Sequence, residues 1–105
     1  EATKILLSHA KPPKAIFYGC DAMAAGGCRY LREQGIKVPD DIGVLGFDNL
    51  PIAQLMGITT LDQFVESKID MVVDYLIARL QIGGAKKSKQ DMVSITPHII
   101  ERTSL

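Results

Sequence analysis

Two acidic residues follow predicted strands, at positions where a carboxylate could hold a polar ligand. Asp21 comes after the apolar stretch AIFYG and Cys20, and Asp48 comes directly after the run IGVLGF at residues 42–47. A carboxylate offers two acceptor oxygens and can accept hydrogen bonds from two neighbouring hydroxyls, which is the usual chemistry for holding a sugar. Asp48 is therefore a candidate ligand-binding residue. The alternative is that it caps a short helix predicted at residues 50–56.

The elements that position these residues form a βαβ unit. Residues 14–35 predict a strand, a tight turn and a helix that ends at Gly35, and residues 42–47 predict a second strand, apolar enough to be covered on both faces. Such units give a parallel sheet with flanking helices, an α/β fold. Because ligands bind beyond the carboxyl ends of parallel strands, we expect Asp48 to share one sheet edge with the Cys20–Asp21 turn.

The second half of the chain predicts another strand, a long helix and a final strand. The stretch ITTLDQ, residues 58–63, reads as a short strand, and residues 64–82 carry an apolar stripe at helical spacing. Apolar residues alternate over residues 93–99, where Pro97 fits an edge strand better than a central one.

Three residues near the expected sheet edge have a second interpretation. Asp21 stands where an N-cap of the following helix belongs, and we expect capping to be its first role, with a ligand contact as the alternative. Cys20 could act as a nucleophile, but a cysteine enzyme needs a general base, and only His9 and His98 exist, both far away in the sequence. Gln63 could present its amide to the same edge or remain in a solvated loop.

Composition narrows the function classes. The 105 residues carry 12 basic and 12 acidic side chains, so the segment lacks the basic excess of a DNA-binding domain. No apolar run reaches the roughly 18 residues of a membrane span. The sequence has no phosphate-binding glycine pattern and no zinc-ligand spacing, so we expect no cofactor and no metal. The two cysteines lie too far apart on one helix for a disulfide, and reduced cysteines favour the cytoplasm.

Several segments together are similar to one family. The stretches AIFYGCDAMAAG, GIKVPDDIGVLGFD, the TT pair and the closing IERTS, in this order over residues 12–105, resemble the effector-binding region of LacI/GalR-family transcriptional repressors. The resemblance implies a type I periplasmic-binding-protein-like fold, two α/β lobes with a small effector, a sugar or a nucleobase, between them. It also implies no enzyme activity, and DNA binding only through an N-terminal helix-turn-helix that is absent from this chain.

The resemblance assigns parts of the chain to the two lobes. It places residues 1–61 in the C-terminal lobe, residues 62–96 in a crossover helix and strand of the N-terminal lobe, and residues 97–105 in a return strand to the C-terminal lobe. Asp48 matches the family's ligand-binding carboxylate, and Gln63 matches a position that sometimes lines the pocket. Cys20 stands where sugar-binding members often carry Asn, so no particular sugar is assigned.

Small or soft apolar residues lie on two predicted helices. By sequence alone Ala22, Ala25, Ala53 and Met56 fit a core better than an oligomer contact. In the family, however, these two helices form the main dimer contact, so the resemblance implies a homodimer through these four residues. The alternative function is a sugar-binding protein of a transport system with the same fold. Upstream sequence would discriminate, since a helix-turn-helix means a regulator and a secretion signal means a transport component.

Overall fold

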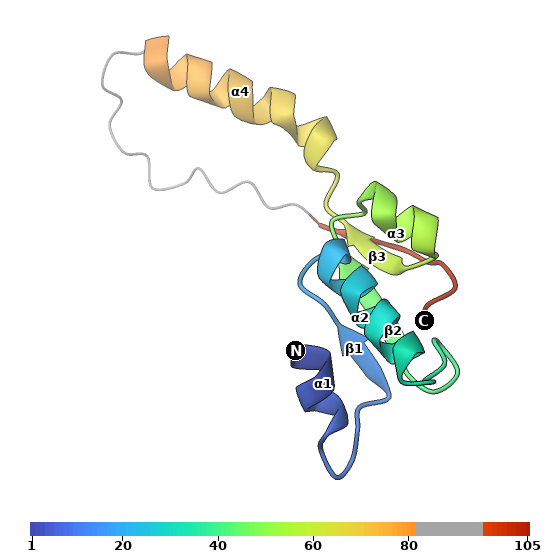
Figure 1. The fold of residues 1–105 in the computed structure, drawn as a ribbon. Coiled ribbons are helices and arrows are strands. Elements are labelled where there is room, and N and C mark those ends of the chain that lie inside the picture. The colour runs from blue at the N-terminus through green and yellow to red at the C-terminus, as the bar shows by residue number, and fades with distance from the viewer. Residues whose placement is uncertain (82–95) are drawn as a thin grey trace. The chain divides into compact units, whose positions relative to one another are not determined.

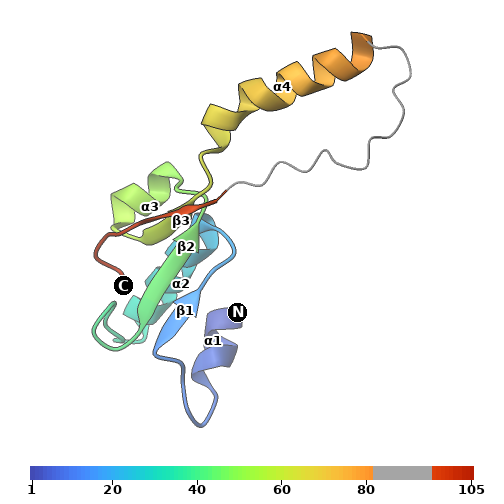
Figure 2. The same cartoon turned by 180° about the vertical axis from the view of Figure 1, so that it is seen from behind.

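The computed structural model describes residues 1–81 and 96–105, and these belong to two compact units (Figures 1 and 2). The first unit contains Glu1–Asp62 and His98–Leu105, and the second unit contains Gln63–Pro97. The chain therefore leaves the first unit after residue 62 and returns to it at residue 98.

The first unit is built on a four-stranded sheet with the order β1-β2-β3-β4. The strands are β1 (Ala15–Phe17), β2 (Gly43–Phe47), β3 (Thr59–Asp62) and β4 (His98–Ile100). β1, β2 and β3 are mutually parallel, which confirms the predicted βαβ unit, and β4 pairs with β3 antiparallel at the edge of the sheet. Of the predicted final strand at residues 93–99, the described part is β4 from His98, and residues 93–95 belong to the segment 82–95 that lies outside the described residues.

Three helices accompany this sheet: α1 (Ala2–Leu7), α2 (Asp21–Glu33) and α3 (Pro51–Met56). In Figure 1, α2 crosses in front of the strands and α3 lies beside β3. α2 ends as the sequence predicts, because Gly35 adopts a left-handed conformation with φ 73° just past the last turn.

The core lies between α2 and one face of the sheet. Ile16 of β1 and Val44 of β2 pair in register and are buried, together with Leu31 of α2. On the other face Phe17 is 57% exposed, and its ring meets Phe47 edge-on with the centroids 6.2 Å apart. The prediction that residues 42–47 are covered on both faces is met in part, since Ile42, Gly43, Val44 and Gly46 are buried and Leu45 and Phe47 are half-buried.

A close approach of α2 to the end of β1 explains why residue 27 is a glycine. A Cβ at Gly27 would overlap the ring and hydroxyl of Tyr18, so only glycine fits there. The Tyr18 hydroxyl in turn lies 2.9 Å from the Thr3 hydroxyl, and both side chains are buried. This hydrogen bond ties α1 to the end of β1.

The second unit contains the long helix α4 (Val65–Gln81), close to the predicted residues 64–82. Its described apolar side chains are exposed: Val73 is 44% exposed, Ile69 51% and Leu80 82%. No helix among the described residues is long and apolar enough to cross a membrane.

Candidate functional site

The carboxyl ends of β1 and β2 lie at one edge of the sheet. The two strands pair in parallel with Phe17 opposite Leu45, and the Tyr18 amide continues the ladder by donating to the Leu45 carbonyl at 2.8 Å. This confirms the geometric expectation behind the candidate site, because the residues that follow the strands, Cys20 and Asp48, leave the sheet at the same end. We call Cys20, Asp48 and Asn49 the rim.

Asp48 is exposed and has an unusual backbone conformation. Its φ is 98° and that of Asn49 is 52°, so two consecutive non-glycine residues have positive φ. Such conformations cost about 1–3 kcal/mol each and persist where surrounding contacts hold them, often at functional sites. The Asp48 amide is held by the Leu61 carbonyl at 2.8 Å. The chain thus turns sharply from β2 into α3 with Asp48 at the corner.

The alternative role of Asp48 as a helix cap does not fit the bounds of α3. The N-cap residue of α3 is Leu50, with extended φ and ψ, and Pro51 is the first helical residue. The amide of Leu50 donates to the Asp21 carboxylate at 2.6 Å. Asp48 therefore does not occupy the N-cap position.

Asp21 lies inside the protein rather than at the rim. The prediction that it caps α2 is wrong, because Cys20 is the N-cap residue and Asp21 is the first residue of the helix. Its carboxylate is fully buried and accepts hydrogen bonds from the Leu50 amide and the Thr60 hydroxyl, both at 2.6 Å. A Cβ at Gly46 would overlap Asp21 Oδ1, so the glycine makes room for this carboxylate. Both oxygens are thus engaged by the protein, which is inconsistent with direct contact to a ligand.

Arg102, which sequence reasoning did not single out, contacts the residue next to Asp48. Its Nη2 donates to Asn49 Oδ1 at 2.8 Å, and Asn49 Nδ2 donates to Asp62 Oδ2 at 2.9 Å. The sequence carried no signal for this contact, since Arg102 is 53 positions from Asn49. Only the return of the chain to pair as β4 brings them together.

Two further residues, Cys20 and Gln63, were predicted to lie near this edge of the sheet. Cys20 is half-buried and is not in a disulfide, nor is Cys28, as the sequence predicts. Burial raises the pKa of the Cys28 thiol, with the nearby Arg32 acting in the opposite direction. Gln63 is half-buried and follows Asp62, the last residue of β3, but it belongs to the second unit.

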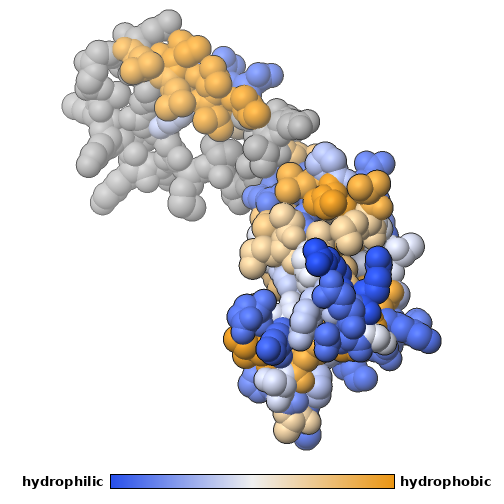
Figure 3. Space-filling model, in the orientation of Figure 1, coloured by the Kyte–Doolittle hydropathy of each residue, from blue (hydrophilic) through white to orange (hydrophobic). Residues whose placement is uncertain are grey.

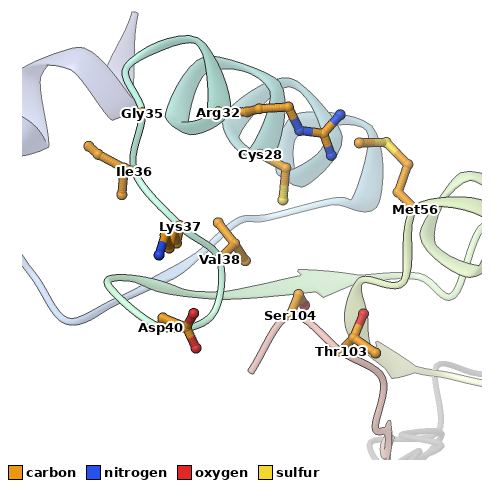
Figure 4. Close-up of a pocket in the computed structure, with 10 residues that line it drawn as sticks. All are labelled: Cys28, Arg32, Gly35, Ile36, Lys37, Val38, Asp40, Met56, Thr103 and Ser104. Carbon is orange, nitrogen blue, oxygen red and sulfur yellow. The ribbon is translucent and has the colours of Figure 1, made fainter.

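Two cavities of the first unit are lined by residues other than Asp48, Cys20, Asp21 and Gln63. One, of about 520 Å³, lies where α2 ends and the chain enters β2, and Figure 4 shows Cys28 and Arg32 of α2 facing Met56 of α3 there. The other, of about 450 Å³, lies between α1 and α2.

The described residues contain no cluster of three histidine, cysteine or acidic side chains that could hold a metal ion. Enzyme chemistry at Cys20 would need a base beside the thiol. His9 lies after α1, and His98 opens β4 opposite Asp62, at the same end of the sheet but with β2 and β3 between β4 and β1.

The four residues predicted for an oligomer contact divide by burial. Ala22 is exposed, and Ala25 and Met56 are half-buried. Ala53 is fully buried in the core, so it offers no surface to a partner, and its small size instead lets α3 pack closely inside the unit. The sequence-based preference for a core role fits Ala53 and, in part, Ala25 and Met56, which are packed against the core.

Large apolar side chains that the sequence reasoning missed lie on the same two helices. Met23 of α2 is 56% exposed and Leu55 of α3 is 82% exposed. In Figure 3, hydrophobic surface gathers in the part of the first unit where Figure 1 places α3. The burial of neighbouring residues indicates that Met23 and Leu55 face outward, because the buried Ala24 and Ala53 fix which sides of the two helices face inward.

Comparison with known proteins gives the family. The whole chain, residues 1–105, matches the family model for the periplasmic binding protein-like domain. The ribose operon repressor of Escherichia coli (strain K12) is 35% identical over 99% of this chain and 31% of its own length. The chain thus spans about a third of the length of this curated relative.

Solved structures give the same result. A LacI-type transcription regulator from Bifidobacterium animalis subsp. lactis is 36% identical with a TM-score of 0.84, over 98% of this chain and 36% of its own. A LacI-family regulator from Lactobacillus casei with bound sucrose is 30% identical with a TM-score of 0.77, over 98% and 38%. The chain belongs to the periplasmic binding protein-like domain family. The predicted resemblance to LacI-family regulators is confirmed by these relatives.

Proposed function

We propose that this chain is the effector-sensing and dimerisation segment of a LacI-family transcriptional regulator that responds to a small molecule, a sugar. One observation carries the proposal: an exposed carboxylate, Asp48, stands at the shared carboxyl edge of parallel strands on a backbone with φ 98°. The relatives support a regulator over a transport protein, since those described above are repressors and regulators, one of them solved with bound sucrose.

In this proposal Asp48 accepts hydrogen bonds from two adjacent effector hydroxyls. Cys20 and Gln63 contribute the neighbouring wall, where Cys20 offers only a weak donor and so disfavours a polar contact at that point. Asp21 supports the rim from inside, because its buried carboxylate holds Leu50, two residues after Asp48.

We assign residues 1–61 and the return strand 97–105 to the C-terminal lobe, and residues 62–96 to the N-terminal lobe. The division of the chain into two compact units, which changes after Asp62 and again before His98, supports this assignment. DNA binding would reside in an N-terminal helix-turn-helix outside this chain, and the intact regulator would act in the cytoplasm.

We further propose that α2 and α3 form the contact of a homodimer. Ala22, Ala25 and Met56 would supply close approach, and the exposed Met23 and Leu55 would supply apolar area. Replacing Leu55 with Glu should shift the intact regulator from dimer to monomer in light scattering with little loss of secondary structure, because the side chain is 82% exposed. Gln54→Glu, an exposed charge change on the same helix, is the control.

The effector site is tested by a thermal-shift screen of the intact regulator against D-ribose, D-glucose, sucrose, cellobiose, adenine, guanine and hypoxanthine. Calorimetry with the compound that gives the largest shift follows. Asp48→Asn should weaken binding at least tenfold, because an amide presents one acceptor instead of two. Asp40→Asn, an exposed carboxyl in the loop before β2, should leave it unchanged. Equal affinity of the Asp48→Asn variant and its parent would reject the proposal.

A further inference from the structure

We propose that Arg102 is a positioning residue for the effector-binding carboxylate, acting through the side chain of Asn49. This inference rests on the proposed function, because it assigns Arg102 a role in presenting Asp48 to the effector. Arg102 itself lies beneath the rim and is half-buried, so it holds the neighbouring residue rather than the effector.

Arg102 is held at the start of β3 by one hydrogen bond from its guanidinium and one from its backbone amide. Nη1 donates to the Ile58 carbonyl at 2.8 Å, and the Arg102 backbone amide donates to the Thr59 hydroxyl at 2.9 Å. Nη2 is then left to donate to Asn49 Oδ1 at 2.8 Å. A planar guanidinium held in this way presents its remaining N–H groups in one direction, which a lysine ammonium cannot reproduce.

Both polar atoms of the Asn49 side-chain amide form hydrogen bonds. Its oxygen accepts from Arg102, and its nitrogen donates to Asp62 Oδ2 at 2.9 Å. Its backbone amide also lies 3.4 Å from the Thr60 hydroxyl. The amide thus bridges a cation from the C-terminal segment and a carboxylate at the end of β3, and this fixes the residue in its left-handed conformation with φ 52°.

We call the hydrogen bonds of the Asn49 side chain to Arg102 and Asp62 the clamp. The clamp determines where the Asp48 side chain can be. On one side the Asp48 amide is bound to the Leu61 carbonyl, and on the other side the chain continues into the held Asn49. Two consecutive positive φ values at non-glycine residues relax when nothing holds them. Without the clamp, effector binding would have to order this corner, and the affinity would fall by the cost of that ordering.

The test compares variants of the intact regulator by calorimetry with the compounds of the screen above. Arg102→Lys keeps the charge but loses the planar guanidinium with its two donor nitrogens, so effector affinity should fall about tenfold. Asn49→Gly permits a positive φ but removes both side-chain hydrogen bonds, and it should weaken affinity at least fivefold. In the Asn49→Gly background, Arg102→Lys should add less than a twofold loss, because the residue through which it acts is already gone. Arg29→Lys, an exposed arginine on α2, is the matched control and should stay within twofold of the parent.

Each outcome decides a different point. If none of the compounds binds the parent, the proposed function fails and the role of Arg102 with it. If Asp48→Asn loses binding while Arg102→Lys stays within twofold, only the positioning role is overturned. If the two losses multiply in the double variant, Arg102 does not act through Asn49. Should Arg102→Lys fail to fold by circular dichroism, Asn49→Gly alone decides, and parental affinity in that variant overturns the clamp.

Discussion

Replacing Asp21 with Ala should destabilise the protein by about 3 kcal/mol. The carboxylate is fully buried and accepts two hydrogen bonds, from the Thr60 hydroxyl and the Leu50 amide, both at 2.6 Å. Hydrogen bonds to a charged group contribute about 1.5–3 kcal/mol each, and the Leu50 amide is only partly buried, which lowers its share. The figure is the cost of truncation and includes the donors left without an acceptor.

Unfolding in urea, followed by circular dichroism at 222 nm, measures this change. Asp40→Ala, which removes an exposed carboxyl, should change the free energy of unfolding by less than about 0.5 kcal/mol. Thr60→Val keeps the shape of the side chain but removes the hydroxyl donor, and should cost about 1–2 kcal/mol. The double variant should lose less than the sum of the single losses, because both changes remove the same hydrogen bond.

Two results would refute this reasoning. A loss below about 1 kcal/mol for Asp21→Ala would mean that the buried carboxylate adds little beyond its own desolvation cost. Strict additivity of Asp21→Ala and Thr60→Val would mean that the 2.6 Å contact is not energetically coupled.

Three further outcomes are expected. Gly27→Ala should lower the free energy of unfolding by about 1–3 kcal/mol in urea titrations, because the added Cβ overlaps Tyr18. Cys28 should react with iodoacetamide more slowly than an unfolded control at pH 8, because burial raises the pKa of its thiol and leaves less thiolate. The reaction rate should keep rising as the pH passes the usual thiol pKa. Equal rates in the folded protein and the unfolded control would contradict this. Glu33→Gln should leave the midpoint of urea unfolding unchanged, since its salt bridge to Arg29 is exposed.

Local pattern was enough to predict most elements of the fold. Alternation and helical spacing predicted β1, α2, β2 and α4 to within a few residues, because strands and helices place their apolar residues at different periods along the sequence. The order of these elements also predicted the parallel pairing, since a helical crossover between neighbouring strands leaves little other choice. The shared edge of Cys20 and Asp48 followed from that pairing alone.

Side-chain partners far apart in sequence were not predictable. Asp21 was expected to cap its own helix, but its carboxylate is used by Thr60 and Leu50, which are 39 and 29 positions away. Sequence alone favoured a core role for Ala53, whereas the family resemblance grouped it with the dimer contact. Small side chains serve tight helix contacts both inside and between subunits, and only the burial of Ala53 separates the two cases.

The sequence by itself determined which residues form strands and helices and which end of the sheet carries Asp48, because these depend on local periodicity and on chain direction. The tertiary structure decided what holds that carboxylate in place. Arg102 reaches Asn49 only because the chain returns after residue 97 and pairs as β4 along β3. Local patterns carry no information about such a return, since its hydrogen bonds form between segments that meet only in the folded state.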